Sequence, residues 1–329
     1  MAAATTNSDS TPMELEDRDL CARYARFFPL DSYRVVTSND DTVRFWDCRS
    51  DKKLLAAEPI PRGLSTVCMS LDGASVFGLG GDDRDVTTEK WDVGTSQRQF
   101  EVKCDQDANG VAMARDGTKL INYSCSGVYI LDSKTGEVVS SYGDIPRVFS
   151  ATFSPDGKRY AVGNDSGDVA VCDTATGAIE WRKRLHKEDP DNGECVGSVD
   201  FHRDGDLLLS GGLHDGAFVC SRAADGSDVF RRKIDNTDKL RMAKFSPDGR
   251  QFATASYGGK ARVYDVETVN CVVDTHHTDI VWDVDFSNDQ RSMVTACEDG
   301  FARIWDLREQ HGSTKKAAMT FDISKAAKK

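Results

Sequence analysis

The sequence predicts an all-β fold assembled from seven similar units of roughly 40–45 residues each. Three observations predict it. An aspartate recurs in a turn at nearly constant intervals, a strand-like run ending in aspartate recurs in step with it, and short apolar runs alternate with polar turns. Recurrence at a period of this length is typical of repeat architectures, in which each unit buries its apolar faces against its neighbours.

The clearest of these units spans residues 276–306. It contains an apolar run at 280–286, a second run at 293–297 and a third that ends at Trp305-Asp306, with polar turn residues between them. These features predict three short strands joined by reversals of the chain. A sheet this small has two apolar faces and no core of its own, so the unit needs similar neighbours.

The first recurring landmark is an aspartate in the turn after the first strand of each unit. The seven aspartates are Asp31, Asp72, Asp116, Asp156, Asp204, Asp248 and Asp289. They are separated by 41, 44, 40, 48, 44 and 41 residues, and glycine follows five of the seven. Two turns have the full sequence Ser-Pro-Asp-Gly, at 154–157 and 246–249, and these residue types suit a tight turn.

The second landmark is the end of the third strand. It has the sequence FWD at 45–47, KWD at 90–92, ILD at 130–132, VCD at 171–173, VYD at 263–265 and IWD at 304–306. The fifth unit deviates at 218–222. A polar turn and a further β-rich run follow each ending, as at 137–139, so the pattern predicts four strands in each of seven units.

With both landmarks in register, the chain resembles the WD40-repeat family. The resemblance implies a seven-bladed β-propeller of four-stranded antiparallel blades. We expect the propeller to span 16–323, between a disordered N-terminal tail (1–15) and a basic C-terminal tail (324–329). The outer strand of the last blade has two candidates, residues 317–323 and residues 13–15. The C-terminal run is favoured because it is richer in β-forming residues.

Composition limits the classes of function. Of the 329 residues, 39% are hydrophobic and 29% charged, and the formal net charge is −12. An acidic chain repels a phosphate backbone, so we expect no direct nucleic-acid binding by the propeller, and at most a minor contact through the basic C-terminal tail. No apolar run is long enough for membrane insertion. The N-terminus has neither the basic start nor the apolar stretch of a secretory signal, which predicts an intracellular protein, cytoplasmic or nuclear.

The polar residues of unit seven invite both a structural and a catalytic interpretation. The resemblance implies that His277, Thr295, Asp299 and Trp305 form an internal hydrogen-bonded chain inside an apolar sheet. A histidine beside an aspartate could also act in catalysis. The structural interpretation is preferred because no nucleophile has a matching spacing.

No other pattern indicates chemistry. The ten cysteines are scattered without a C-x-x-C pair, which is typical of reduced core thiols. No phosphate-binding, zinc-protease or calcium-loop motif occurs, so we expect no cofactor, no metal and no enzymatic activity. Four further histidines are expected at the surface or in turns: His186, His202, His214 and His311.

One position in each predicted first strand indicates a binding surface. In this family, partners usually bind near the central channel, on the face where the innermost strands begin. The residues four positions before the last apolar residue of each first strand are Tyr24, Ser65, Asn109, Phe149, Gly197, Arg241 and Trp282. Aromatic residues and arginine are enriched at binding hot spots, so Tyr24, Phe149, Arg241 and Trp282 form the hypothetical protein-binding site. The alternative is that the aromatic residues pack between blades.

These observations favour a non-enzymatic scaffold or adaptor that mediates protein–protein interactions within an intracellular multiprotein complex. The alternative is a recognition module that binds a short peptide, modified or not, at the channel rim, and a propeller enzyme is a third hypothesis. Two segments depart from the repeat length, 81–89 and 182–194, and are expected to be enlarged turns that could contact partners.

Overall fold

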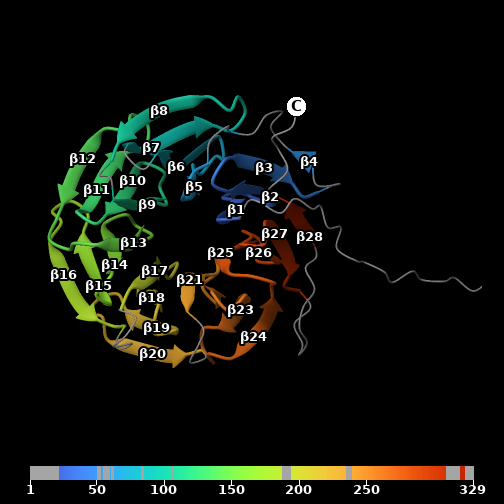
Figure 1. The fold of residues 1–329 in the computed structure, drawn as a ribbon. Coiled ribbons are helices and arrows are strands. Elements are labelled where there is room, and N and C mark those ends of the chain that lie inside the picture. The colour runs from blue at the N-terminus through green and yellow to red at the C-terminus, as the bar shows by residue number, and fades with distance from the viewer. Residues whose placement is uncertain are drawn as a thin grey trace, which may run out of the picture.

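Seven four-stranded antiparallel sheets are arranged in a ring around a central axis (Figure 1). The structure, a computed structural model, describes residues 22–49, 53–54, 60, 63–82, 85–104, 107–186, 194–234, 239–308 and 319–322. The predicted fold class, an all-β seven-bladed propeller, is confirmed. In the described part of the chain, no helix is long and apolar enough to cross a membrane. The predicted tails, 1–15 and 324–329, lie outside the described residues.

Each blade is formed by four strands that are consecutive in the sequence, from the innermost to the outermost. Blades one to three contain β1 (Tyr24–Phe28), β2 (Asp31–Ser38), β3 (Val43–Asp47), β4 (Lys53–Leu54), β5 (Val67–Met69), β6 (Ser75–Asp82), β7 (Asp85–Asp92), β8 (Arg98–Lys103), β9 (Ala108–Met113), β10 (Lys119–Ser124), β11 (Gly127–Asp132) and β12 (Val138–Tyr142).

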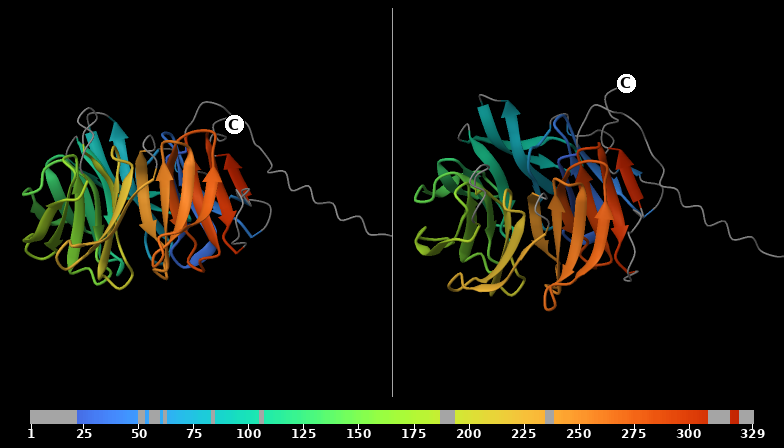
Figure 2. Two further views of the ribbon diagram at one scale, coloured as in Figure 1. Left: turned by 90° about the horizontal axis from the view of Figure 1, so that it is seen from below. Right: turned by 60° about the horizontal axis from the view of Figure 1, so that its bottom comes forward.

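Blades four to seven repeat this order with strands that are almost all six residues long. They contain β13 (Val148–Phe153), β14 (Arg159–Asn164), β15 (Asp168–Asp173), β16 (Ile179–Arg184), β17 (Val196–Phe201), β18 (Leu207–Gly212), β19 (Ala217–Arg222), β20 (Asp228–Lys233), β21 (Leu240–Phe245), β22 (Gln251–Ser256), β23 (Lys260–Asp265), β24 (Cys271–His276), β25 (Val281–Phe286), β26 (Ser292–Cys297), β27 (Phe301–Asp306) and β28 (Met319–Asp322). Seen from the side, the strands run between the two faces of the ring (Figure 2).

The recurring aspartates hold the turns between the first and second strands. In blade four, the Ser154 hydroxyl donates to Asp156 Oδ1 at 2.7 Å, and the same carboxylate accepts the backbone N–H of Lys158 at 3.1 Å. Gly157 has a φ of 66°, a left-handed conformation that favours glycine. The Ser-Pro-Asp-Gly sequence therefore supplies the side-chain acceptor and the backbone freedom that this turn requires.

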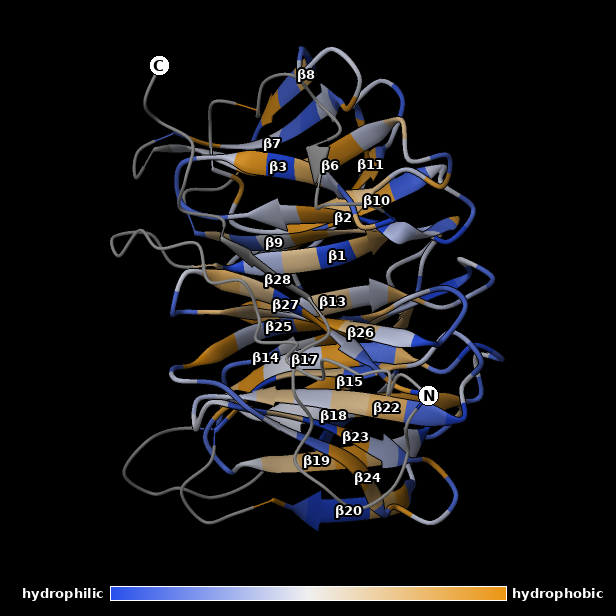
Figure 3. Ribbon diagram, turned by 90° about the vertical axis from the view of Figure 1, so that its right-hand side faces the viewer, coloured by the Kyte–Doolittle hydropathy of each residue, from blue (hydrophilic) through white to orange (hydrophobic). Residues whose placement is uncertain are grey.

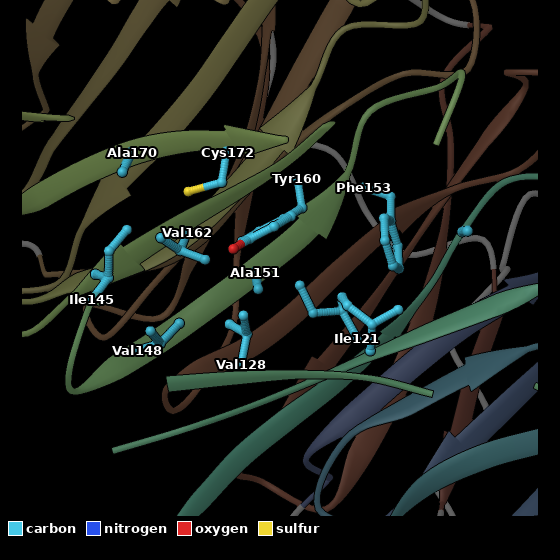
Figure 4. Close-up of a cluster of buried hydrophobic side chains, with 12 residues drawn as sticks. Ile121, Val128, Ile145, Val148, Ala151, Phe153, Tyr160, Val162, Ala170 and Cys172 are labelled. Atoms are coloured by element: carbon cyan, nitrogen blue, oxygen red, sulfur yellow. The ribbon is translucent and has the colours of Figure 1, made fainter. Parts of the chain in front are cut away.

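Apolar side chains fill the space between neighbouring blades. Between blades three and four, Ile121 on β10 packs in one buried cluster with Val148 and Phe153 on β13 and Val162 on β14 (Figure 4). Burying one such side chain stabilises the fold by about 1.5–3 kcal/mol. Since each sheet buries both faces in this way, no blade has a core of its own.

The outermost strands present polar edges to solvent, as β20 does in Figure 3. On β16 the residues Arg182, Lys183 and Arg184 are all exposed, and on β20 the residues at 231–233 are exposed and basic. Exposed basic side chains on a strand edge discourage pairing with another chain. The basic stretch predicted as part of an enlarged turn at 182–194 is therefore partly strand, and residues 187–193 lie outside the described residues.

The segment 81–89 is also mostly strand, contrary to the expectation of an enlarged turn. Strands β6 and β7 are each eight residues long, and Gly81 pairs with Val86 while Asp82 pairs with Asp85. A glycine-rich stretch can continue a ladder when both partners are extended, so the extra residues lengthen this hairpin instead of widening its loop.

The ring closes between blade seven and blade one without a shared strand. Strand β28 pairs with β27, so the preference for the C-terminal run is confirmed, and residues 13–15 lie outside the described residues. Two carboxylates of β25 bind the backbone of β1: the N–H of Ala25 donates to Asp283 Oδ2 at 3.2 Å, and that of Phe27 donates to Asp285 Oδ2 at 2.9 Å. Hydrogen bonds to charged groups contribute about 1.5–3 kcal/mol each.

Candidate protein-binding surface at the channel mouth

A channel with a cavity of about 660 Å³ runs along the ring axis and is lined by the innermost strands. We call the face at which these strands begin the front face. Phe149, Arg241 and Tyr24 all lie near the start of their strands and line the channel. The structure therefore brings three of the four predicted binding residues to one channel mouth.

A β-bulge marks the start of the innermost strand in blades three to seven. The residue left unpaired is the second of each strand: Asn109, Phe149, Gly197, Arg241 and Trp282. A bulge re-aims a side chain out of the sheet's regular alternation. Five of the positions predicted from the sequence are thus the bulge positions of the ring.

In blade one the predicted position, Tyr24, is one residue too late in the strand. Thr37 pairs with Ala25, as Thr295 pairs with Val284, so the residue corresponding to Trp282 is Arg23 and not Tyr24. The reason is that the apolar run of β1 is one residue longer: Phe27 corresponds to Phe286, and Phe28 follows it. A count from the last apolar residue therefore stops one position late.

Trp282 lies between two guanidinium groups at the front face. The Cζ atom of Arg23 is 4.4 Å from the centre of its ring, and that of Arg241 is 5.8 Å away. The indole N–H donates to the Glu298 carboxylate, which also lies 3.7 Å from Arg23 Nη1. The Tyr257 ring meets Trp282 edge-on at 5.7 Å. We refer to Arg23, Arg241, Tyr257, Trp282 and Glu298 as the Trp282 cluster.

Phe149 lies apart from this cluster, because blade five separates blade four from blade six. The bulge residue of blade five is Gly197, whose carbonyl accepts from Arg241 Nη1 at 3.4 Å. A Cβ at Gly197 would lie 3.1 Å from two carbonyl oxygens of β21, so a larger residue would crowd this approach. Phe149 itself is 38% exposed, which is unusual for a phenylalanine on an inner strand.

Deeper in the channel, charged side chains are paired. Arg26 lies 3.0 Å from Asp283, and Lys244 lies 2.6 Å from Asp285. Burial raises the pKa of Asp283 above its ordinary value and raises the pKa of Asp200 to about 6. Since Asp283 and Asp285 also bind the backbone of β1, this level of the channel holds the ring closed.

Of the four polar residues predicted to form a hydrogen-bonded chain in blade seven, three are linked: His277, Thr295 and Trp305. His277 Nε2 lies 2.8 Å from Thr295 Oγ1, which also accepts the Trp305 indole N–H at 2.9 Å. Asp299 does not bind the histidine, contrary to expectation. Its carboxylate instead accepts from the Arg303 guanidinium at 3.0 Å and from the Thr278 hydroxyl at 2.6 Å. His277 Nδ1 is buried without a hydrogen-bond partner in the described part of the chain.

The expectation that His186 is a surface or turn residue was wrong. Its side chain is 1% exposed; Nδ1 lies 3.0 Å from Asp215 Oδ2, and Nε2 lies 2.8 Å from Ser210 Oγ. His186 and Ser210 are 24 residues apart, against 18 for His277 and Thr295, because the segment before β17 is longer. Because of that insertion, the spacing in the sequence did not identify His186 as the counterpart of His277. Ser210 nevertheless has the same place in β18 as Thr295 in β26.

The order Asp215–His186–Ser210 is also that of a hydrolase triad. Ser210 is 1% exposed and lies inside the sheet, and none of the three residues lines the channel. A nucleophile needs access to its substrate, so these residues act as an internal brace. Among the described residues, no group of three histidine, cysteine or acidic side chains is placed to hold a metal ion.

The fold and these internal sets define a seven-bladed propeller built from repeats. The family model for the WD domain, G-beta repeat, matches residues 184–221, 235–265 and 269–306, which correspond to blades five to seven. The WD repeat-containing protein SL1-17 of Schistosoma mansoni is 32% identical over 150 residues, covering 45% of this chain and 46% of that protein. The match thus spans about half of the relative's length.

The chain is a seven-bladed β-propeller, and its blades five to seven match the WD domain, G-beta repeat, of the family that the sequence resembles. Propellers of this family generally mediate protein–protein interactions. The repeats specify a rigid support, and the identity of a partner depends on the side chains at its surface.

Proposed function

We propose that the protein is a non-enzymatic scaffold that binds a partner protein within an intracellular complex, through the mouth of the channel at the front face. The observation that carries this proposal is the contact of Arg23 and Arg241 with Trp282 at the front face, where Phe149 is also exposed near the start of β13. Tyr24 lines the channel beside them.

The residue types and their support fit a protein interface. Tryptophan, tyrosine and arginine supply most of the binding energy at such interfaces. Here they lie at innermost strands, each fixed by a ladder with the second strand of its blade and by packing between blades, so little ordering is required on binding.

A second candidate is a recognition module for a short peptide. The channel behind the cluster favours it, because a cavity of about 660 Å³ is large enough to receive side chains from an extended segment. The two candidates share one surface and differ in whether a peptide from the partner binds alone. We expect no direct nucleic-acid binding by the propeller, since the chain is acidic.

Affinity purification tests the proposal. The triple variant Phe149→Ala, Arg241→Ala and Trp282→Ala should lose its main partners by tenfold or more, since two or three hot-spot residues contribute about 1.4 kcal/mol or more together. The matched control replaces exposed apolar residues of the outermost strands: Val138→Ala, Val139→Ala and Ile179→Ala. If the front-face variant remains folded and retains every partner of the unmodified chain, the proposal is wrong.

A further inference from the structure

The channel lining is basic although the chain is acidic. The formal net charge is −12, yet five basic side chains and two carboxylates line the cavity. The carboxylates are Asp200 and Asp285. The basic side chains are Arg26, Arg115, Arg203, Arg241 and Lys244. A concave site lined mainly by one sign of charge attracts ligands of the opposite sign.

Two of the five basic side chains are paired deep in the channel, whereas, in the described part of the chain, Arg241 at the front mouth is not. Arg26 is paired with Asp283 and Lys244 with Asp285. Arg241 has no carboxylate partner among the described residues, and the single hydrogen bond shown for it there is the 3.4 Å contact with the Gly197 carbonyl. A guanidinium has five N–H donors, so most donors of Arg241 remain available.

Two tyrosine hydroxyls share this mouth. Tyr24 and Tyr123 line the cavity with Arg241, and the described residues offer neither hydroxyl a hydrogen bond. Burial raises the pKa of both phenols, so each stays protonated and can donate. The Tyr123 ring lies against Gly110, where an added Cβ would be 2.1 Å from its hydroxyl oxygen. The missing side chain at Gly110 therefore lets this hydroxyl sit at the channel wall.

The same arrangement disfavours a cationic ligand. Trp282 is the aromatic surface that a lysine or arginine from a partner would use at this face. Its ring already has Arg23 at 4.4 Å and Arg241 at 5.8 Å. A further cation would meet two positive charges, which is how a site discriminates against the wrong partner.

We propose that the channel mouth receives an acidic side chain, glutamate or aspartate, from an extended segment of the partner protein. Arg241 is the charged donor to the carboxylate, and the hydroxyls of Tyr24 and Tyr123 are the neutral donors. The inference rests on the proposed function, because it defines the chemistry of the segment that docks at the same face. Arginine suits this role because its donors match the geometry of a carboxylate.

Fluorescence anisotropy of the full chain with three labelled peptides tests this inference. The peptides share a glycine–serine sequence and differ only in three central residues, which are glutamate, glutamine or lysine. The glutamate peptide should bind at least tenfold more tightly than the glutamine peptide, because hydrogen bonds to a charged group contribute about 1.5–3 kcal/mol. The lysine peptide should bind no better than the glutamine peptide.

Substitutions then locate the site. Arg241→Gln should weaken the glutamate peptide about tenfold or more, and Tyr24→Phe and Tyr123→Phe a few-fold each. The control Arg147→Gln removes an arginine of the same face that is 67% exposed and paired with Asp165, and it should change nothing. Arg241→Lys keeps the charge and loses the two-pronged donor, so it provides a folded variant of intermediate affinity if the glutamine variant does not fold.

The inference is overturned if the glutamate and glutamine peptides bind equally, or if the lysine peptide binds best. It is also overturned if substitutions of Arg241 leave the affinity for the glutamate peptide unchanged. The proposed function has a separate outcome. If the triple front-face variant loses its partners while the peptides do not discriminate by charge, the scaffold role stands and the acidic segment is wrong. If that variant keeps all partners, the scaffold role itself is wrong.

Discussion

Blade five and blade seven brace the same positions with different hydrogen bonds. In blade five the histidine binds the aspartate and the hydroxyl, as Asp215–His186–Ser210. In blade seven the histidine binds the hydroxyl of Thr295, which also binds Trp305, while the aspartate binds an arginine. Blade seven matches the family pattern better in sequence, yet blade five has the more complete link between aspartate and histidine.

Residues on the third strand account for this difference. Arg303 on β27 pairs with Thr295, whereas the residue that pairs with Ser210 on β19 is Val219. The arginine takes the Asp299 carboxylate, and a valine cannot. Two blades that share an aspartate, a histidine and a hydroxyl can therefore form different networks, because a neighbour outside the motif competes for one partner.

The largest expected effect comes from removing the aspartate of blade five. Asp215 accepts from His186 and from the backbone N–H of Ala217 at 3.0 Å, and it is nearly buried. Asp215→Ala leaves both donors unsatisfied in the sheet and should lower the free energy of unfolding by about 3 kcal/mol. Urea denaturation of the variant and the unmodified chain measures this change in the free energy of unfolding.

The matching substitution in blade seven, Asp299→Ala, should cost only about 1 kcal/mol. Its main partner, Arg303, is 17% exposed and can be solvated by water. If the two aspartate variants lose the same stability, the difference between the two networks has no energetic consequence.

The second effect is a pH dependence specific to blade seven. Burial, assisted by the nearby Arg303, lowers the pKa of His277 to about 3, from 6.5 for an ordinary histidine. Between these values the unfolded chain binds a proton that the folded chain excludes, so stability is lost as the pH falls below 6.5. At pH 5 the loss from this residue is about 2 kcal/mol.

His277→Gln removes this titration and tests the assignment. The variant should lose less stability than the unmodified chain when the pH is changed from 7 to 5, with urea unfolding measured at both values. Equal losses in the two proteins would show that His277 does not titrate in this range.

The fold could be predicted from the sequence because its determinants are local and repeated. Each turn that contains a recurring aspartate, such as Asp156, depends on residues within one hairpin, and so does each strand ending such as 304–306. The repeat is recognised from the copies in register although the copy at 218–222 deviates. The choice of the C-terminal run for β28 also rested on local β propensity. In each case the signal lies within a few residues of the structure it specifies.

The candidate site was only partly predictable, since it depends on register and on distant contacts. Counting from an apolar residue found Phe149, Arg241 and Trp282, but the count missed Arg23 because Phe28 extends the apolar run of β1 by one residue beyond the position of Phe286. The contact between Arg23 and Trp282 joins opposite ends of the chain and exists only after the ring closes. His186 was missed because an insertion changes its spacing from the strand.

The third effect compares the two hydroxyls. Thr295→Val removes the partner of both His277 and Trp305, whereas Ser210→Ala removes one partner of His186 and leaves its bond to Asp215. Each hydroxyl also donates to a carbonyl of the third strand at 3.4 Å, so the loss of that bond is common to both variants. We expect a loss of about 2 kcal/mol for the threonine variant and about 1 kcal/mol for the serine variant. Thermal and urea unfolding of both proteins give the difference. A larger loss for the serine variant would contradict the assignment of two donors to Thr295.

The smallest effect on stability should come from converting blade seven to the pattern of blade five. Arg303→Val copies Val219 and releases Asp299, whose carboxylate still attracts a proton to His277 while the repulsion from the guanidinium is lost. The pKa of His277 should therefore rise, as followed by an NMR titration of its ring, while the free energy of unfolding at pH 7 changes by less than about 1 kcal/mol.

The control for this conversion is Arg308→Val, which removes an arginine of the same blade that is 65% exposed and paired with Asp306. It should leave the pKa of His277 unchanged. If Arg303→Val also leaves that pKa unchanged, burial alone keeps the ring neutral, and the arginine does not set the difference between the blades. If the pKa rises only in the Arg303 variant, one residue outside the repeat motif decides which brace a blade forms, and blades without such an arginine should resemble blade five.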